Sequence, residues 1–445
     1  MSRSISPIDG RYQEKLRHLS NYFSEHALFK YRVKVEILYF IEFIQKVLKV
    51  KISKPQLQYL HYIYVNFNDK DTSRIKEIEK TTKHDVKAVE YFIKSKLEQT
   101  NLSKYAEFVH FGLTSQDINN TSVPMLLQDA TREQMLPKYL ELYKKIQALG
   151  RSNKRLSMLA RTHGQPASPT TLGKEILVFS ERLKKQIDLL QKFKISGKFG
   201  GATGNFNAHA VAYPKINWPV WADKFLSNKL FIERQRTTTQ IAHYDEIAEY
   251  CHIIIRTNTI LLDFCKDMWT YISMEYFTQQ VKAGEVGSSA MPHKVNPIDF
   301  ENAEGNLGIA NSLFSHLAEK LPISRMQRDL TDSTVIRNMG TPISHSYLSI
   351  LSIINGLNKV NVNPVKIKND LNNNWIILAE AIQTILRRER INGAYEMLKD
   401  LTRGRTEISK NELHEYIHSL KLNPKIKNEM LRLTPFNYIG FAAKI

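Results

Sequence analysis

The sequence is poor in cysteine and has no long apolar run. Its 445 residues include two cysteines, Cys251 and Cys265, which are too few for a disulfide framework and suit a reducing compartment. It contains no run of about 18 consecutive apolar residues, so we expect no membrane span. The first residues lack the apolar segment of a secretory signal, and we therefore expect a cytoplasmic protein.

Glycine and proline are also scarce, with 18 and 15 residues. Neither occurs between Gly10 and Pro55, or between Pro219 and Gly284. Strands need frequent turns, which these residues usually mark, so such gaps predict long helices. The stretch before Gly284 also has a seven-residue repeat of large residues, at Ile247, Ile254, Leu261 and Met268, and at Tyr250, Thr257, Phe264 and Tyr271. This repeat is typical of the buried face of one helix in a bundle, here a helix ending at Gly284.

We therefore predict an all-α protein with three domains built around long helices. The domains are an N-terminal helical domain at 1–111, a central long-helix bundle at 112–363 and a small helical domain at 364–445. Glycine and proline mark breaks in the central domain at 197–219, 284–308 and 340–342. Between Gly112 and His163 we expect another long helix, interrupted or kinked near Pro137. Polar residues gather at the breaks, where a rigid bundle can carry functional side chains.

The chain carries a large excess of positive charge. Lysine and arginine number 63 and aspartate and glutamate 44, which gives a net charge of +19. This excess favours an anionic partner, such as a nucleic acid, a membrane surface or an acidic substrate. A nucleic-acid-binding protein is one reading, but the sequence has no recognised binding motif and no evident basic stripe with stacking aromatic residues. Motifs for a metal site, a phosphate-binding P-loop or a dinucleotide fold are also missing.

The most informative segment is residues 284–297, which follows the longest helical run. Two glycines give it mobility and two prolines forbid a helix. Between them lie Ser288, Lys294 and Asn296, a combination that suits a loop closing over an anionic ligand. Polar groups also gather in segments 161–166, 109–117 and 81–85, around His163, around Thr114 and Ser115, and around His84 and Asp85. Taken singly, each of these could be a helix cap or a solvated loop.

Together and in this order, the segments resemble the fumarase/aspartase superfamily. Residues 287–297 read GSSAMPHKVNP and are similar to its signature GSSxMPxKxNP, and Thr114-Ser115 and Thr162-His163 match its two other blocks. Residues 6–12, 82–85 and 328–333 are similar to the bacterial-type branch that cleaves adenylosuccinate. The similarity extends over nearly the whole chain.

The resemblance implies an all-α homotetramer whose active sites are shared between chains, with no cofactor or metal. It implies two reactions that release fumarate. One converts adenylosuccinate to AMP, and the other converts succinylaminoimidazole carboxamide ribotide (SAICAR) to the carboxamide ribotide (AICAR). The expected partners are therefore small molecules and copies of the same chain, and not a nucleic acid or a membrane.

The resemblance also assigns roles to single residues. Ser288 is the general base and His163 the general acid, which Glu301 orients. Lys294 and Asn296 hold the carboxylates of the succinyl group. Arg11, Tyr12, Arg328, Ser333 and Arg337 hold the phosphate and ribose, Thr114 and Ser115 contact the succinyl end, and Lys83, His84, Asp85, Gln240, Ser289, Val295, Asn302 and Thr334 complete the substrate pocket. At the position of Asn302 some family members carry arginine, so its contact is open.

Other lyases of the superfamily remain alternatives, namely argininosuccinate lyase, fumarase and aspartase. All of them share the central loop. The arginines predicted at the phosphate end argue against fumarase and aspartase, because fumarate and aspartate have no phosphate for these arginines to bind.

Overall fold

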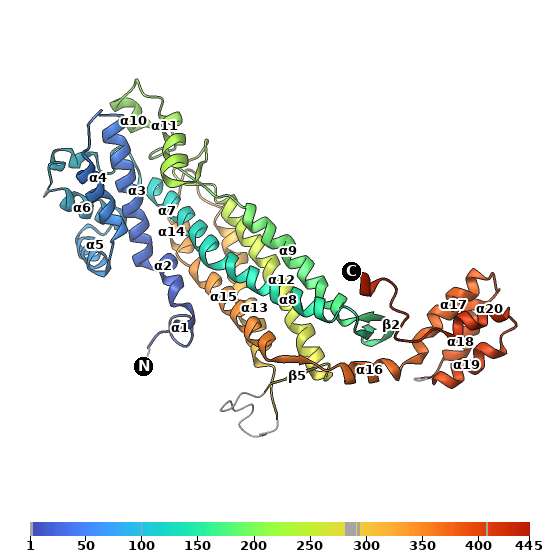
Figure 1. Ribbon diagram of the computed structural model, residues 1–445. Coiled ribbons are helices and arrows are strands. Elements are labelled where there is room, and N and C mark those ends of the chain that lie inside the picture. The colour runs from blue at the N-terminus through green and yellow to red at the C-terminus, as the bar shows by residue number, and fades with distance from the viewer. Residues whose placement is uncertain (1–2, 99, 281–290, 292–293, 406–407) are drawn as a thin grey trace. The chain divides into compact units, whose positions relative to one another are not determined.

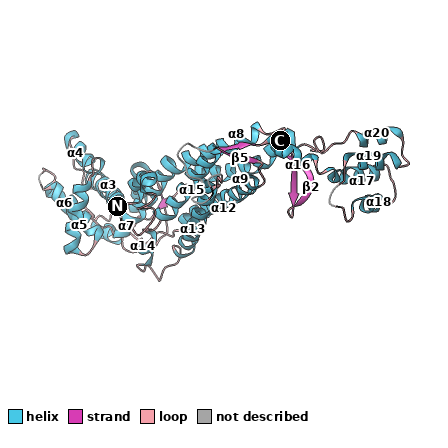
Figure 2. Cartoon of the chain, turned by 90° about the horizontal axis from the view of Figure 1, so that it is seen from below, coloured by secondary structure: helices cyan, strands magenta, loops and turns pink. Residues whose placement is uncertain are grey.

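The computed structural model describes residues 3–98, 100–280, 291, 294–405 and 408–445. Helices dominate these residues, and the strands are confined to three two-stranded sheets. Figure 2 shows how few strand segments stand among the helices. The prediction of a mostly helical protein is therefore confirmed. Within the described residues, no helix is long and apolar enough to cross a membrane.

The chain forms two compact units, and the first combines residues 1–139, 186–259 and 305–349. Its core lies around α3, where Tyr39 and Phe43 contact the rings of Phe199, Trp218 and Phe225. The elements of this unit are α1 (Gln13–Leu16), η1 (Arg17–Leu19), α2 (Ser20–Phe23), α3 (Glu25–Lys46), α4 (Lys54–Val65), α5 (Asp69–Thr82), α6 (Asp85–Leu97), η2 (Ser103–Phe108), α7 (Ser115–Ala130), the π-helical η3 (Thr131–Met135), β3 (Ser196–Gly197), α10 (Asn207–Ala212), α11 (Trp218–Phe225), the π-helical η4 (Leu226–Leu230), β4 (Glu233–Arg234) and α14 (Thr331–Ile336).

The second unit combines residues 140–185, 260–304 and 350–445. Its last part has a core of its own, which includes Leu386, Leu398, Leu413 and Ile417. The elements of this unit are β1 (Ser157–Thr162), β2 (Gln165–Thr171), β5 (Phe277–Gln279), β6 (Val360–Val362), α16 (Pro364–Asn372), η5 (Trp375–Leu378), α17 (Ala379–Arg388), α18 (Ala394–Thr402), α19 (Lys410–Ser419), α20 (Pro424–Leu431) and η6 (Ala442–Lys444).

Long helices contribute residues to both units. They are α8 (Leu136–Ser152), α9 (Leu172–Lys192), α12 (Asp245–Ser273), α13 (Ile298–Lys320) and α15 (Gly340–Lys359). In the first unit, the amide of Asn258 on α12 donates to Asn311 on α13 at 3.0 Å and to Ser346 on α15 at 2.9 Å. In the second, Phe179 of α9 contacts Phe264 of α12 with ring centroids 5.3 Å apart, and the two helices run side by side (Figure 1).

The seven-residue repeat lies on α12 as predicted. Ile254, Leu261 and Met268 are fully buried, and so is Phe264 on the second row, because a repeat of this length keeps one face of a helix toward its neighbours. The helix ends at Ser273, however, and not at Gly284. A short strand, β5, follows and pairs with β6. The predicted end at Gly284 lies outside the described residues.

Other boundaries also differ from the predictions. The stretch from Gly112 to His163 does contain a long helical segment interrupted near Pro137, because a π-helical turn joins α7 to α8 there, but α8 ends at Ser152 and the chain then enters strand β1. The break expected at 284–308 ends earlier, because α13 begins at Ile298. At 340–342 a helix begins, with Gly340 as its first residue. The division into domains 1–111, 112–363 and 364–445 stays a prediction.

Candidate active site

A cavity of about 310 Å³ in the first unit gathers predicted residues from three distant segments. Lys83, His84 and Asp85 come from the α5–α6 junction, Ser115 from the start of α7, and Arg328, Ser333 and Arg337 from the chain around α14. The cavity is also lined by Leu28, Arg32, Glu79, Gln116, Asn119, Asn120, Val123, Tyr244, Leu330 and Ile336. The cations and hydrogen-bond donors among these residues suit an anionic ligand.

The α5–α6 junction turns sharply at the cavity. Lys83 adopts a left-handed conformation with φ of 53°, which ends α5 and lets His84 cap α6. The Nδ1 atom of His84 accepts a hydrogen bond from the backbone N–H of Lys87 at 3.1 Å. An imidazole that accepts through Nδ1 carries its proton on Nε2, which lies 3.3 Å from the hydroxyl of Ser115. His84 is thus oriented to donate to Ser115.

Ser115 is the first residue of α7, and its position is fixed by the helix cap. The backbone N–H of Thr114 donates to the carboxylate of Asp117 at 2.8 Å, as in a capping box. Asp117 is fully buried and also accepts from Lys198 at 2.7 Å and from the N–H of Gly200 at 2.8 Å. These contacts fix the start of α7, where free N–H groups favour an anion.

The loop before α7 is held by two buried side chains that the sequence did not single out. The Tyr39 hydroxyl donates to the carbonyl of Phe111 at 2.6 Å and lies 2.9 Å from Nε2 of His209. The His209 ring fills the space beside Gly112, since a Cβ there would lie 2.8 Å from it and φ is +70°. Burial lowers the pKa of His209 to about 4, so it is neutral near pH 7.

Arg328 and Ser333 form one hydrogen-bonded group at the cavity. The guanidinium of Arg328 donates to Ser333 at 3.1 Å and to the side-chain oxygen of Gln240 at 3.2 Å. Gln116, which is 1% exposed, donates to the same Ser333 hydroxyl at 3.2 Å. The predicted residue Gln240 therefore joins the site through Arg328. Gln116 was not predicted, because a buried glutamine beside a helix cap gives no distinct sequence signal.

Asp85 accepts hydrogen bonds from two arginines. Its Oδ2 atom lies 2.8 Å from Arg337 and 2.9 Å from Arg32. Burial alone would raise the pKa of the Asp85 carboxyl, but the charges of the two arginines outweigh it and hold the pKa below its ordinary value. Asp85 is therefore ionised at neutral pH, and the group of three keeps one net positive charge.

His163 belongs to the second unit and occupies a hairpin turn rather than the predicted helix break. Strands β1 and β2 pair with Thr162 opposite Gln165, so His163 and Gly164 form a two-residue turn, with φ of 53° and 77°. Positive φ at both positions is typical of the turn that matches the twist of a hairpin. The turn leaves His163 exposed. In the described part of the chain, no hydrogen bond joins it to Glu301, whose carboxylate accepts from the Trp269 indole at 3.0 Å.

The other predicted residues that the structure describes are not among those lining this cavity. Ser288 and Ser289 are outside the described residues. Lys294 and Val295 are exposed and Asn296 half-buried in the segment before α13, while Asn302 on α13 donates to Ser352 at 2.9 Å. Arg11 and Tyr12, with the guanidinium 6.0 Å from the ring centre, and Thr114 and Thr334 do not line the cavity. The roles of all these residues stay predictions.

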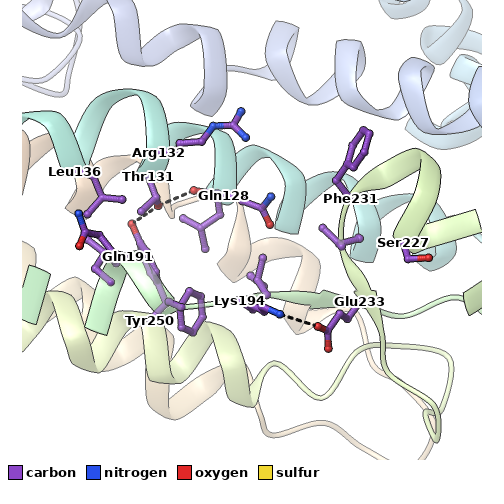
Figure 3. A pocket seen from close by; sticks show the side chains of 15 residues that line it. Gln128, Thr131, Arg132, Leu136, Gln191, Lys194, Ser227, Phe231, Glu233 and Tyr250 are labelled. Carbon is purple, nitrogen blue, oxygen red and sulfur yellow. Dashed lines mark hydrogen bonds and ion pairs between the residues drawn. The ribbon is translucent and has the colours of Figure 1, made fainter. Parts of the chain in front are cut away.

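A larger cavity of about 460 Å³ in the first unit contains none of the predicted residues (Figure 3). Several of its polar side chains pair within the protein. Thr131 donates to Tyr250 at 3.0 Å, and Lys194 contacts Glu233 at 3.3 Å. Most of the other lining side chains are apolar, such as Leu127 and Phe231. The smaller cavity, which carries cations and polar groups, is therefore the better candidate for an active site.

Comparisons with known proteins identify the family. The sequence profile of the lyase family matches residues 10–310, and that of the adenylosuccinate lyase C-terminal family matches residues 324–439. The adenylosuccinate lyase of Dictyostelium discoideum is 53% identical over 98% of this chain and 96% of its own length. Those of Haemophilus influenzae and Escherichia coli (strain K12) are 46% and 44% identical, each over 99% of this chain and 97% of its own length.

The fold is similar to solved structures of more distant proteins. A fumarate lyase from Mesorhizobium sp. matches with a TM-score of 0.75 at 17% identity, over 97% of this chain and 96% of that one. The 3-carboxy-cis,cis-muconate lactonizing enzyme from Pseudomonas putida matches with a TM-score of 0.74 at 17% identity, over 96% and 94%. Fold and site thus define a lyase of the fumarase/aspartase type. Within that superfamily, the chain belongs to the adenylosuccinate lyase family.

Proposed function

We propose that this protein removes fumarate from adenylosuccinate to give AMP, and from SAICAR to give AICAR. The observation that carries the proposal is the cavity in which Lys83, Arg328 and Arg337 gather beside Ser333. Both substrates carry a phosphate, and guanidinium groups with neighbouring hydroxyls are well suited to bind one. The relatives in Dictyostelium discoideum and Escherichia coli carry the name of this activity.

The proposed reaction is a β-elimination. Ser288 removes a proton from the carbon next to one carboxylate of the succinyl group, and the electron pair forms the double bond of fumarate as the C–N bond breaks. His163 gives a proton to the departing nitrogen, which stays on the nucleotide. Lys294 and Asn296 stabilise the extra negative charge that the carboxylate carries before the bond breaks. Atoms balance, because the substrate yields only fumarate and the nucleotide.

The phosphate end of the nucleotide is bound at the cavity in this proposal. Arg328 and Arg337 provide the cations, and Ser333 and Gln240 orient Arg328. Ser115, which faces His84, contacts the succinyl end. Arg11, Tyr12 and Glu301 complete the site, with Glu301 orienting His163.

The proposal includes a homotetramer in the cytoplasm, in which each active site takes residues from several chains. The exposed turn that carries His163 supports this part, because a general acid needs a site that excludes water. The positive charge of the chain serves the capture of anionic substrates in this proposal and not the binding of a nucleic acid or a membrane.

An absorbance assay with purified protein tests the function directly. We expect adenylosuccinate to be converted to equal amounts of AMP and fumarate, and SAICAR to AICAR and fumarate. Argininosuccinate, aspartate and malate serve as matched controls, since each would reveal another lyase of the superfamily. Turnover of one of these controls in place of adenylosuccinate would refute the proposal.

A further inference from the structure

Arg32 is a buried cation whose two polar contacts are with residues of the candidate site, while its guanidinium also lies 5.8 Å from the ring centre of Phe29 in the core. It lies on α3, which runs beside α7 (Figure 1), and is 3% exposed. Its Nε atom donates to the side-chain oxygen of Asn119 at 2.9 Å, and a terminal nitrogen lies 2.9 Å from Oδ2 of Asp85. Asn119 and Asp85 both line the cavity. A buried guanidinium is costly unless it is paired, so these contacts fix its position.

The contact between Arg32 and Asp85 affects how far Asp85 can neutralise the charge of Arg337. The same Oδ2 atom of Asp85 lies 2.8 Å from Arg337, whose side chain is 51% exposed. One carboxylate thus faces two guanidinium groups, and its single negative charge cannot neutralise both. Because Arg32 is held in the interior, the surplus positive charge is carried by the arginine that can reach a ligand.

We propose that Arg32 is a positioning residue for the phosphate-binding end of the site, acting through Asp85 on Arg337. The inference rests on the proposed function, since it takes a phosphate as the ligand of Arg337. Arg32 keeps Asp85 in place and shares its charge, so that Arg337 is aimed at the cavity but not fully paired. Without Arg32, Asp85 would bind Arg337 alone, and an incoming phosphate would have to compete with a complete ion pair.

A purely structural role for Arg32 makes different predictions. If the role were purely structural, loss of Arg32 would lower the stability of the protein but leave the folded enzyme with normal substrate affinity. A positioning role at the phosphate end changes KM and the affinity for AMP, and leaves kcat nearly unchanged, because the proposed acid and base are not involved. If Arg32 is a positioning residue, the change in AMP affinity caused by replacing Arg32 also depends on the presence of Asp85.

The test compares variants of the full-length enzyme by steady-state kinetics and AMP calorimetry. In Arg32→Met we expect KM for adenylosuccinate and Kd for AMP to rise by at least about 10-fold, with kcat within about 3-fold of the wild type. Arg32→Lys keeps the charge but has no fork to reach both Asn119 and Asp85, so its loss should be smaller. In Arg74→Gln, a control that removes an exposed arginine paired with Glu77, both constants should stay unchanged.

The double variant Arg32→Met/Asp85→Asn gives the decisive outcome. The Asp85→Asn change removes the carboxylate that would otherwise neutralise Arg337, so Arg32→Met should weaken AMP binding less in the Asp85→Asn protein than in the wild type. If Arg32→Met does not fold, KM for adenylosuccinate and Kd for AMP are compared between Arg32→Lys and the double variant instead. Normal AMP affinity in folded Arg32 variants, or a loss that Asp85→Asn does not relieve, would overturn the inference. Failure of the wild type to cleave adenylosuccinate would instead refute the proposed function.

Discussion

At the scale of the residue, the proposed base and acid are side chains with little reactivity of their own. A serine hydroxyl ionises only beside strong donors and away from water, and a histidine on an exposed turn has no fixed proton acceptor. We expect Ser288→Ala and His163→Ala each to lower kcat by at least about 10²-fold, the low end for general acid–base catalysis. AMP should still bind to both variants, because the arginines of the cavity are unchanged. Steady-state assays and AMP calorimetry measure the two quantities.

A matched control for the histidine is His252, which is exposed on α12 and has no proposed role. His252→Ala should have the kcat of the wild type. Near-normal turnover in Ser288→Ala or in His163→Ala would remove that residue from its proposed role.

The two arginines of the cavity have different surroundings, and this affects what each variant should lose. Arg328 donates to Ser333 and Gln240, so Arg328→Ala also frees two groups that line or support the cavity. Arg337→Ala leaves Asp85 bound to Arg32 alone. Loss of a charge-assisted hydrogen bond costs about 1.5–3 kcal/mol, so AMP should bind roughly 10- to 150-fold more weakly to either variant. Unchanged Kd values in calorimetry would contradict the assignment.

Sequence patterns pointed to some of the polar residues that line the cavity but not to those that hold them in place. Lys83, Asp85 and Arg337 belong to segments with unusual clusters of polar residues, which a reader of the sequence can notice. Arg32 lies between Lys30 and Lys34 and His209 between two alanines, and neither stretch differs from ordinary helical sequence. Their roles depend on burial and on partners far away in the chain, and local composition reveals neither the burial nor the partners.

At the scale of the element, α10 holds the loop that precedes α7 through a single histidine. His209 is fully buried, with its ring against Gly112 and its Nε2 atom 2.9 Å from the Tyr39 hydroxyl. Burial lowers its pKa from 6.5 to about 4 in the folded protein. Between these values the unfolded chain binds a proton that the folded chain does not, so this contribution to stability is lost as the pH falls from about 6.5 to about 4.

The pH dependence of unfolding tests this element. We expect the free energy of unfolding to fall by up to about 3 kcal/mol over that range through His209, which follows from a shift of about 2.5 pKa units. His209→Gln should be less stable at pH 7 but should have a flatter profile below pH 6.5. Urea denaturation at several pH values measures both. Parallel profiles for the two proteins would show that His209 does not titrate in this way.

The long helices were predictable, whereas the hairpin that carries His163 was not. A seven-residue repeat over α12 is a strong signal because every repeat faces the same neighbours. Strands β1 and β2 have only 6 and 7 residues, and β2 contains Pro166 and Pro169, which usually argue against a strand. An edge hairpin of two strands tolerates them. The helix α13 was expected to begin later because Gly305 and Gly308 resemble loop residues, yet both lie within it.

At the scale of the whole molecule, the net charge of +19 should act on the rate of substrate capture. Raising the ionic strength from about 0.1 M to about 1 M shortens the Debye length from about 10 Å to about 3 Å. We therefore expect kcat/KM for adenylosuccinate to fall with added salt, and kcat to change less, since steering acts before the bound complex forms. An equal osmolarity of sucrose is the control. Salt-independent kcat/KM, together with tight binding of duplex DNA at physiological salt, would favour the nucleic-acid reading.

Assembly is the other property that belongs to the whole molecule. The helix α12 has 29 residues, which at about 1.5 Å per residue spans about 44 Å. Helices of this length keep residues near their opposite ends well apart within one chain. Ser115 opens α7, His163 stands on a hairpin turn and Ser288 precedes α13 in the sequence, and in the proposed tetramer each site gathers these three segments from different chains.

Mixing two inactive variants tests that arrangement. Ser288→Ala and His163→Ala proteins, mixed under conditions of subunit exchange, should regain part of the wild-type activity, because some hybrid sites receive an intact Ser288 from one chain and an intact His163 from another. Each variant mixed with itself is the control and should stay inactive. Native mass spectrometry of differently tagged chains verifies that hybrids form. If verified hybrids remained as inactive as the parents, the two residues would have to come from the same chain, and the shared site would be wrong even though the enzyme is a lyase.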